Sequence, residues 1–172
     1  MTLSAADTRP GTRAELYLER WSATSGSERA SRANLVLAGG GHRWRANAGG
    51  NGAIDALLRA VDNALQPLLG AGVELVSFDV HATTTGHDAG ASIVVGVRRS
   101  GEEGPIHVGR AVDENVLQAS VVAYIDAINA LLVHEEIDVA AAVPGPVATL
   151  RHETDPDHRS RAKDRIMSAY NS

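Results

Sequence analysis

The sequence predicts an α+β domain made of two βββα repeats related by a pseudo-twofold axis, with helices packed on mainly antiparallel strands. Two observations predict it. Three strand-like segments followed by an amphipathic helix occur twice along the chain. An offset of 63 residues also superposes the two helices, placing Leu58 on Val121 and Leu65 on Ile128. Because a unit of one helix on three strands is only marginally stable by itself, we expect the two halves to share one core.

In the first half, strands are expected at 16–24, 33–37 and 42–48, where hydrophobic and polar residues alternate. The period then changes from 2 to 3.6, which predicts a helix over 53–69 that ends before Gly70. The apolar side chains at helical spacing are Ile54, Leu57, Leu58, Val61, Leu65 and Leu68.

The second half repeats this order, with strands expected at 73–83, 91–98 and 106–112 and a helix at about 115–133. The segment around Ile93 has apolar residues on one face, which is typical of a half-buried strand. One face of the predicted helix carries Leu117, Val121, Tyr124, Ile128 and Leu131.

The repeats place the folded domain at 14–136, with halves 14–70 and 73–136. Residues 1–13 are polar and are expected to form a disordered leader. Residues 137–172 are expected to form a polar tail that docks loosely, with a weak helix after Pro156.

Composition excludes several classes of function. The 172 residues carry a net charge of −5 and only 3% aromatic side chains, which argues against nucleic acid as a partner. The chain has no cysteine, so disulfides, thiolate metal sites and a cysteine nucleophile are excluded. No apolar run is expected to approach the roughly 18 residues of a membrane span, and the N-terminus lacks a secretory signal. We therefore expect a cytoplasmic protein without a membrane partner.

A glycine-rich segment, Gly49–Gly50–Asn51–Gly52, joins a predicted strand to a predicted helix and is called the glycine corner below. Free backbone N–H groups and the helix dipole favour an anion such as a carboxylate there. The alternative is a plain tight turn in which Asn51 adopts a left-handed conformation. Neither a dinucleotide fingerprint nor a P-loop is present, so no nucleotide cofactor is expected.

His81, His87 and Asp88 lie close together along a predicted hairpin. They lack the spacing of a known metal motif, so we expect hydrogen-bonded structural groups and no metal site. An enzymatic alternative uses His81 with Asp88 or Asp113 as acid and base on a small carboxylate substrate.

Three motifs together resemble the C-terminal regulatory domain of 2-isopropylmalate synthase, and citramalate synthases carry a similar domain. They are the segment 50–56, the segments 78–82 and 86–89, and the segments 113–115 and 119–120. The resemblance covers roughly residues 14–133 and implies two βββα halves, a homodimer and feedback inhibition by leucine or isoleucine.

The resemblance also implies an effector pocket for a branched-chain amino acid or a related carboxylate. The glycine corner would bind the carboxylate, an acidic group the ammonium and apolar side chains the aliphatic tail. The matching positions are Gly50, Asn51, Gly52, Ile54, Leu75, Phe78, Ala82, Ala89, Val112, Asp113 and Glu114.

The sequence departs from the family pattern at Ala53, which replaces a proline, and at Phe78, which replaces a tyrosine. Arg110 and Ala111 also replace a more glycine-rich stretch. The catalytic barrel of the family and its metal-binding His-x-His are not found in these residues. We therefore expect no catalysis by this chain alone, no cofactor, and an effector-binding role that is exerted on a separate catalytic subunit.

Overall fold

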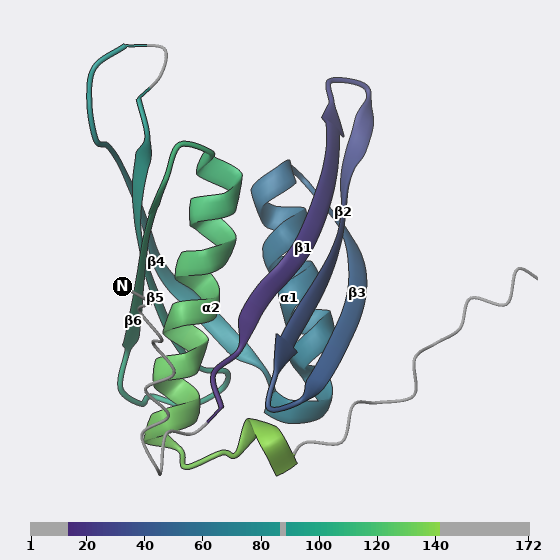
Figure 1. Ribbon diagram of the computed structural model, residues 1–172, viewed down its shortest axis with the longest axis vertical. Coiled ribbons are helices and arrows are strands. Elements are labelled where there is room, and N and C mark those ends of the chain that lie inside the picture. The colour runs from purple at the N-terminus through teal and green to yellow at the C-terminus, as the bar shows by residue number, and fades with distance from the viewer. Residues whose placement is uncertain (1–13, 87–88, 142–172) are drawn as a thin grey trace, which may run out of the picture.

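The computed structural model describes residues 14–86 and 89–141. Three strands and a helix occur twice in this part of the chain (Figure 1). The elements are β1 (Tyr17–Gly26), β2 (Arg29–Gly39), β3 (His42–Gly50), α1 (Ala53–Leu69), β4 (Val73–Ala82), β5 (Ala91–Arg99), β6 (His107–Asp113), α2 (Val116–His134) and a short 3₁₀ helix, η1 (Val139–Ala141). The predicted α+β fold and the predicted helix positions are confirmed.

The strands form two separate antiparallel sheets, in the orders β1-β2-β3 and β4-β5-β6. The turn between β2 and β3 needs glycine. Gly39 pairs with His42, which leaves Gly40 and Gly41 as a two-residue loop with φ angles of 56° and 81°. Positive φ at both central positions is the geometry of a type I′ hairpin, whose twist matches that of the strands.

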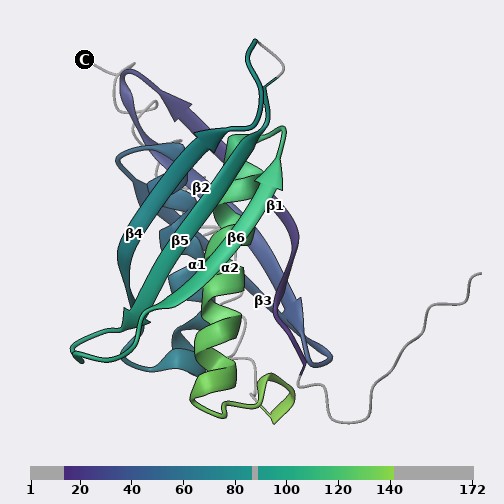
Figure 2. The same cartoon turned by 90° about the vertical axis from the view of Figure 1, so that its left-hand side faces the viewer.

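The two helices lie side by side between the two sheets (Figures 1 and 2). α1 packs on β2 and β3, whereas α2 packs on β5 and β6. The inner faces of the sheets therefore bury leucine and valine side chains against the helices. Leu35 and Leu37 lie on the inner face of the first sheet, and Ile93, Val95 and Val97 lie on that of the second.

Helices and strands approach each other closely because glycine and alanine occupy the positions where they meet. A Cβ atom added to Gly109 in β6 would fall 2.1 Å from the backbone oxygen of Ala123 and 2.2 Å from the backbone nitrogen of Ala127. Gly50 in β3 has the same relation to α1, with 2.5 Å to the nitrogen of Ala56. Glycine is needed at both places because the helix backbone occupies the side-chain position.

Polar contacts also join the two halves. The side-chain amide of Asn129 accepts a hydrogen bond from the Leu16 N–H and donates one to the Leu16 carbonyl, both at 2.9 Å. Arg99 in the second half also donates to the Leu69 carbonyl at the end of α1, while it pairs with Glu135 in its own half. The shared core that the repeat pattern predicts is therefore supplemented by hydrogen bonds between the halves.

The segment after α2 returns to the first half. Val139 in η1 is 2% exposed, and a Cβ atom on Gly39 would lie 3.2 Å from its Cγ1. The Ala140 carbonyl lies 3.0 Å from Nε2 of His42. The packed region thus continues to residue 141, beyond the boundary expected at 136, because a buried valine seals the β2–β3 turn. The rest of the expected tail and the leader at 1–13 lie outside the described residues.

One expectation about apolar segments is wrong. Among the described residues α2 is long and apolar enough, by length and composition alone, to cross a membrane. Its position explains this composition, because ten of its residues are buried between the two sheets. A helix that packs on neighbours from several sides is apolar around most of its circumference.

We expect Gly109→Ala to destabilise the fold by about 3 kcal/mol or more, because the added methyl group meets helix backbone that cannot move aside. Chemical denaturation of the two proteins measures the difference. Gly49→Ala is the matched control in a strand, since its Cβ would lie 3.7 Å from its nearest neighbour. Equal stability of Gly109→Ala and the parent would contradict the close helix–strand contact.

Candidate effector site

The glycine corner ends β3 and starts α1, and it has no left-handed residue. Gly52 is the N-cap of α1 with φ −158°, an extended conformation open to any residue. The left-handed Asn51 considered for a plain turn is therefore absent. A Cβ atom on Gly52 would meet nothing within 4 Å. The conformation and packing of a single chain therefore do not require glycine at this position.

The two helices begin differently. No side chain caps α1, whereas the Asn115 side chain accepts hydrogen bonds from the N–H groups of Leu117 and Gln118 at the start of α2. The first N–H groups of a helix need acceptors from a side chain, water or a ligand. The start of α1 is therefore the helix terminus at which an external anion has room.

Asp55 occupies part of the corner. Its carboxylate accepts a hydrogen bond from the Asn51 N–H at 2.9 Å and pairs with Arg59 at 3.0 Å. These contacts, led by the backbone hydrogen bond, lower the pKa of Asp55 below its usual range. The Asn51 N–H is thus already used, and an incoming carboxylate would have to use the N–H groups that follow Gly52.

The inner face of β4 is largely uncovered. Pairing with the buried residues of β5 places Leu75, Phe78, Val80 and Ala82 on this face, and we call these four residues the β4 strip. Leu75 is 42% exposed and Val80 is 50% exposed. The corresponding strand of the first half, β1, packs its inner side chains Leu18 and Trp21 against the core. The two halves therefore differ, and apolar surface remains open beside α1.

A row of residues closes the end of the second sheet. Ala82 pairs with Ala91, and Ala91 pairs with Asp113, so the three share the inner face. The Asp113 carboxylate accepts a hydrogen bond from the Asn115 N–H at 2.7 Å. Ala89 lies in the adjoining loop, where its N–H contacts the Gly86 carbonyl at 3.4 Å. Ala82 and Asp113 thus lie on the same face at the same end of the sheet.

Other predicted residues lie apart from this row. Val112 is 68% exposed and pairs with Ser92, which places it on the outer face of the sheet. Leu75 lies seven residues along β4 from Ala82, a separation of about 23 Å at the usual rise of a strand. Glu114 is exposed between β6 and α2. A single chain thus gathers only part of the expected pocket.

The glycine corner and the Ala82–Asp113 row nevertheless lie at the same end of the molecule. Both helices begin at that end, where the β4–β5 loop and the β1–β2 hairpin also lie (Figure 1). In the described part of the chain, no hydrogen bond joins the corner to β4.

The groups of the enzymatic alternative do not converge among the described residues. His81 pairs with Ser92 on the outer face of the second sheet, whereas Asp113 lies on the inner face. Asp88 and His87 lie outside the described residues. No group of three or more possible metal ligands occurs in residues 14–86 and 89–141.

Two features of the structure were not predicted. Val80 belongs to the β4 strip, and its alternation with Phe78 and Ala82 could have identified it. The second feature is a hydrogen bond of 2.7 Å from the Tyr124 hydroxyl to Asp62, which joins α2 to α1. Burial raises the pKa of the Asp62 carboxyl, and the hydrogen bond from Tyr124 offsets this only in part. No sequence pattern indicates that these two residues meet.

Comparison with known proteins identifies the family. Residues 2–132 match the model of the LeuA allosteric (dimerisation) domain. This chain belongs to that family. The fold of two similar halves agrees with the resemblance found in the sequence motifs.

The relatives are much longer proteins named 2-isopropylmalate synthase. That of Rhodopseudomonas palustris is 32% identical over 134 residues, which cover 78% of this chain and 24% of the relative. That of Pelotomaculum thermopropionicum is 32% identical over 115 residues, which cover 67% of this chain and 22% of the relative. That of a Caulobacter species is 38% identical over 104 residues, which cover 60% of this chain and 18% of the relative. The chain thus spans less than a quarter of each of these relatives.

The buried Asp62 predicts a pH dependence of stability. A carboxyl whose pKa is raised on folding stabilises fully below its unfolded pKa of about 4, and this contribution is lost as the pH rises through the folded pKa. Asp62→Asn keeps an acceptor for the Tyr124 hydroxyl but removes the charge. We therefore expect the variant to be more stable than the parent at pH 7, with the difference shrinking toward pH 4.

Thermal melting over a pH series measures this effect. Asp79→Asn, on the exposed outer face of β4, is the control. A stability difference between Asp62→Asn and the parent that does not change with pH would contradict a raised pKa at this site.

Proposed function

We propose that this domain binds a small effector with a carboxylate, of the branched-chain amino acid class, and that binding regulates a 2-isopropylmalate synthase-like catalytic unit. The observation that carries the proposal is the uncapped start of α1, which lies at the end of the molecule where the β1–β2 hairpin also lies. Backbone N–H groups at a helix start favour a carboxylate through hydrogen bonds and the helix dipole.

The β4 strip supports an aliphatic ligand. Phe78 and Val80 place apolar side chains on the inner side of the sheet, next to Ala82 along β4 and in line with the buried residues of β5. Asp113 supplies an acidic group at the same end as the glycine corner, which suits an ammonium group. The combination of one anion-binding terminus, one carboxylate and an apolar wall fits an amino acid with a hydrocarbon side chain.

A second copy of the chain is proposed to cover the open side. β4 is an edge strand with free backbone groups, and Leu75 and Val80 on its inner face are exposed. An exposed apolar edge of this kind favours association. The family model describes a dimerisation domain, which supports a homodimer. A dimer would also bring further residues to the incomplete effector site.

The catalytic unit is proposed to lie outside these residues. The relatives are named as synthases, and the matched domain accounts for less than a quarter of their length. Condensation chemistry would therefore belong to the remaining part of such a protein, whether on a separate chain or on the same chain. The cytoplasmic location stays a prediction.

The enzymatic alternative needs His81 and Asp113 to act on one substrate. Since the two lie on opposite faces of one sheet, this would require a second chain or a different sheet geometry. His81→Ala tests it directly. Loss of a measurable turnover of 2-oxo acids, with effector binding unchanged, would favour the enzyme.

Gly52→Val is expected to weaken effector binding at least about tenfold while leaving the melting temperature close to that of the parent. Its side chain would meet no atom of the chain itself, and the φ angle suits any residue, so only an approaching ligand is obstructed. Calorimetric titration with leucine, isoleucine and their 2-oxo acids measures binding. Gly104→Val, where the added Cβ also meets nothing within 4 Å, is the matched control. Unchanged binding by Gly52→Val would place the site elsewhere.

The dimer is tested by Val80→Glu. A carboxylate on the β4 strip is expected to be tolerated by the monomer, where Val80 is half exposed, but to be unfavourable in an apolar interface. Light scattering should show a dimeric parent and a monomeric variant at the same concentration. Val112→Glu, on the outer face of the same sheet, should remain dimeric. A monomeric parent at concentrations of about tens of micromolar would contradict the proposal.

A further inference from the structure

The outer face of the first sheet is strongly basic. By register, Arg20, Arg32, Arg43 and Arg45 all lie on the side that faces away from the helices, and we call these residues the basic face. The inner positions between them, such as Leu35 and Trp44, are buried. Four arginines on one side of a three-stranded sheet are unexpected in a chain whose net charge is −5.

Most of this charge has no acidic partner among the described residues. Arg43 forms an ion pair with Glu19 at 2.6 Å. In residues 14–86 and 89–141, the side chains of Arg20, Arg32 and Arg45 form no ion pair. A solvated sheet face usually mixes both signs, and like charges held together repel each other. The face is thus better suited to an acidic surface than to water alone.

The arrangement of the arginines is ordered by the sheet. Arg20 in β1 and Arg45 in β3 are the register partners of Val36 in β2. The backbones of these two arginines are therefore about 10 Å apart, which is two strand spacings. Val36 is only 6% exposed although it lies on the outer face. Arginine side chains commonly cover apolar neighbours with their aliphatic stems while the guanidinium groups stay in solvent.

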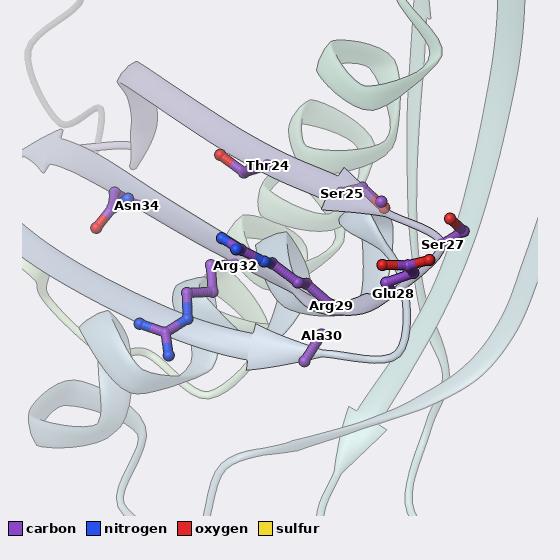
Figure 3. Close-up of a pocket in the computed structure, with 9 residues that line it drawn as sticks. Thr24, Ser25, Ser27, Glu28, Arg29, Ala30, Arg32 and Asn34 are labelled. Atoms are coloured by element: carbon purple, nitrogen blue, oxygen red, sulfur yellow. The ribbon is translucent and has the colours of Figure 1, made fainter.

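A polar hollow continues the basic face at the tip of the β1–β2 hairpin. Its volume is 820 Å³, and it is lined by Thr24, Ser25, Gly26, Ser27, Glu28, Arg29, Ala30, Arg32 and Asn34 (Figure 3). Arg29 adds a further guanidinium close to Arg32, while hydroxyl and amide groups supply hydrogen bonds. All its walls come from one hairpin, so the hollow does not enclose a ligand. We treat it as an extension of the basic face.

We propose that the basic face docks an acidic surface of another protein chain, by paired contacts between arginines and carboxylates. The four arginines of the basic face come from all three strands of the sheet, so an extended acidic surface can contact more of them than one small anion can. Arginine binds carboxylates with two parallel hydrogen bonds, and tyrosine and arginine are enriched at protein interfaces. Tyr17, which is 57% exposed, is on the same outer face.

Other occupants fit less well. The outer positions of this sheet carry one aromatic side chain, Tyr17, so successive nucleic-acid bases have no stacking platform. In a second copy of this chain, the outer face of the second sheet is not a matching surface, because it carries Arg98 and Arg110 as well as Glu74 and Asp79. The basic face reaches the glycine corner at Arg32, the register partner of Gly49, but it lies on the outer side of the sheet, and its proposed role does not depend on the effector proposal.

The test uses the full chain and poly-L-glutamate as the probe, with oligothymidine and inorganic phosphate as alternative anions. We expect poly-L-glutamate to bind the parent at low salt and to bind at least about tenfold more weakly to Arg20→Glu/Arg45→Glu. Arg20→Gln/Arg45→Gln keeps part of the aliphatic stems and should show an intermediate loss. Arg110→Glu, on the outer face of the second sheet, should bind as the parent does, and all variants should melt like the parent.

Several results would overturn the proposal. These are tighter binding of oligothymidine than of poly-L-glutamate, full competition by inorganic phosphate alone, or an equal loss of binding in Arg110→Glu. Absence of poly-L-glutamate binding by the parent at low salt would do the same. Leucine titration of the Arg20→Glu/Arg45→Glu variant should be unchanged, which separates failure here from failure of the effector proposal.

Discussion

The contact of α1 with α2 between two small sheets is the constraint on which the rest of the structure depends. Three strands and one helix have too little buried surface to be stable alone. When the helices pack together, each sheet covers one helix and the two halves share a core. The absence of a side chain at Gly50 and Gly109 allows the strands to contact the helix backbone directly. These two glycines therefore set the distance between each sheet and its helix.

The two halves are not equivalent, and each proposed surface arises from a difference between them. β1 contacts both helices and its inner side chains are covered, whereas β4 leaves its inner face open beside an uncapped α1. The outer face of the first sheet concentrates arginines, while that of the second mixes both signs, as in the Glu74–Arg98 pair at 2.9 Å. Because surface charges contribute weakly to folding, this division costs little stability. One small domain thus carries an apolar surface near the candidate site and a basic surface on the outer face of its first sheet.

The sequence by itself determined the fold class and the element order. The spacing of apolar residues in α1 and α2, and the offset between the two helices, can be read from the sequence directly. This spacing shows which face of each helix is buried without showing what that face packs against. The glycine corner was also visible, because a cluster of glycines between a strand and a helix marks a turn or a close approach of two backbones. Family motifs located Ala82 and Asp113, which the sheet does bring together.

Only the tertiary structure decided which surfaces remain open. Period-two alternation separates the two faces of a strand but does not say which face another element covers, so His81 and Val112 could not be assigned to the outer side of their sheet beforehand. The docking of Val139, the contact of Tyr124 with Asp62 and the gathering of arginines from β1, β2 and β3 join residues distant in sequence. Register and layer packing set these contacts, and neither is encoded in the local pattern of any one segment.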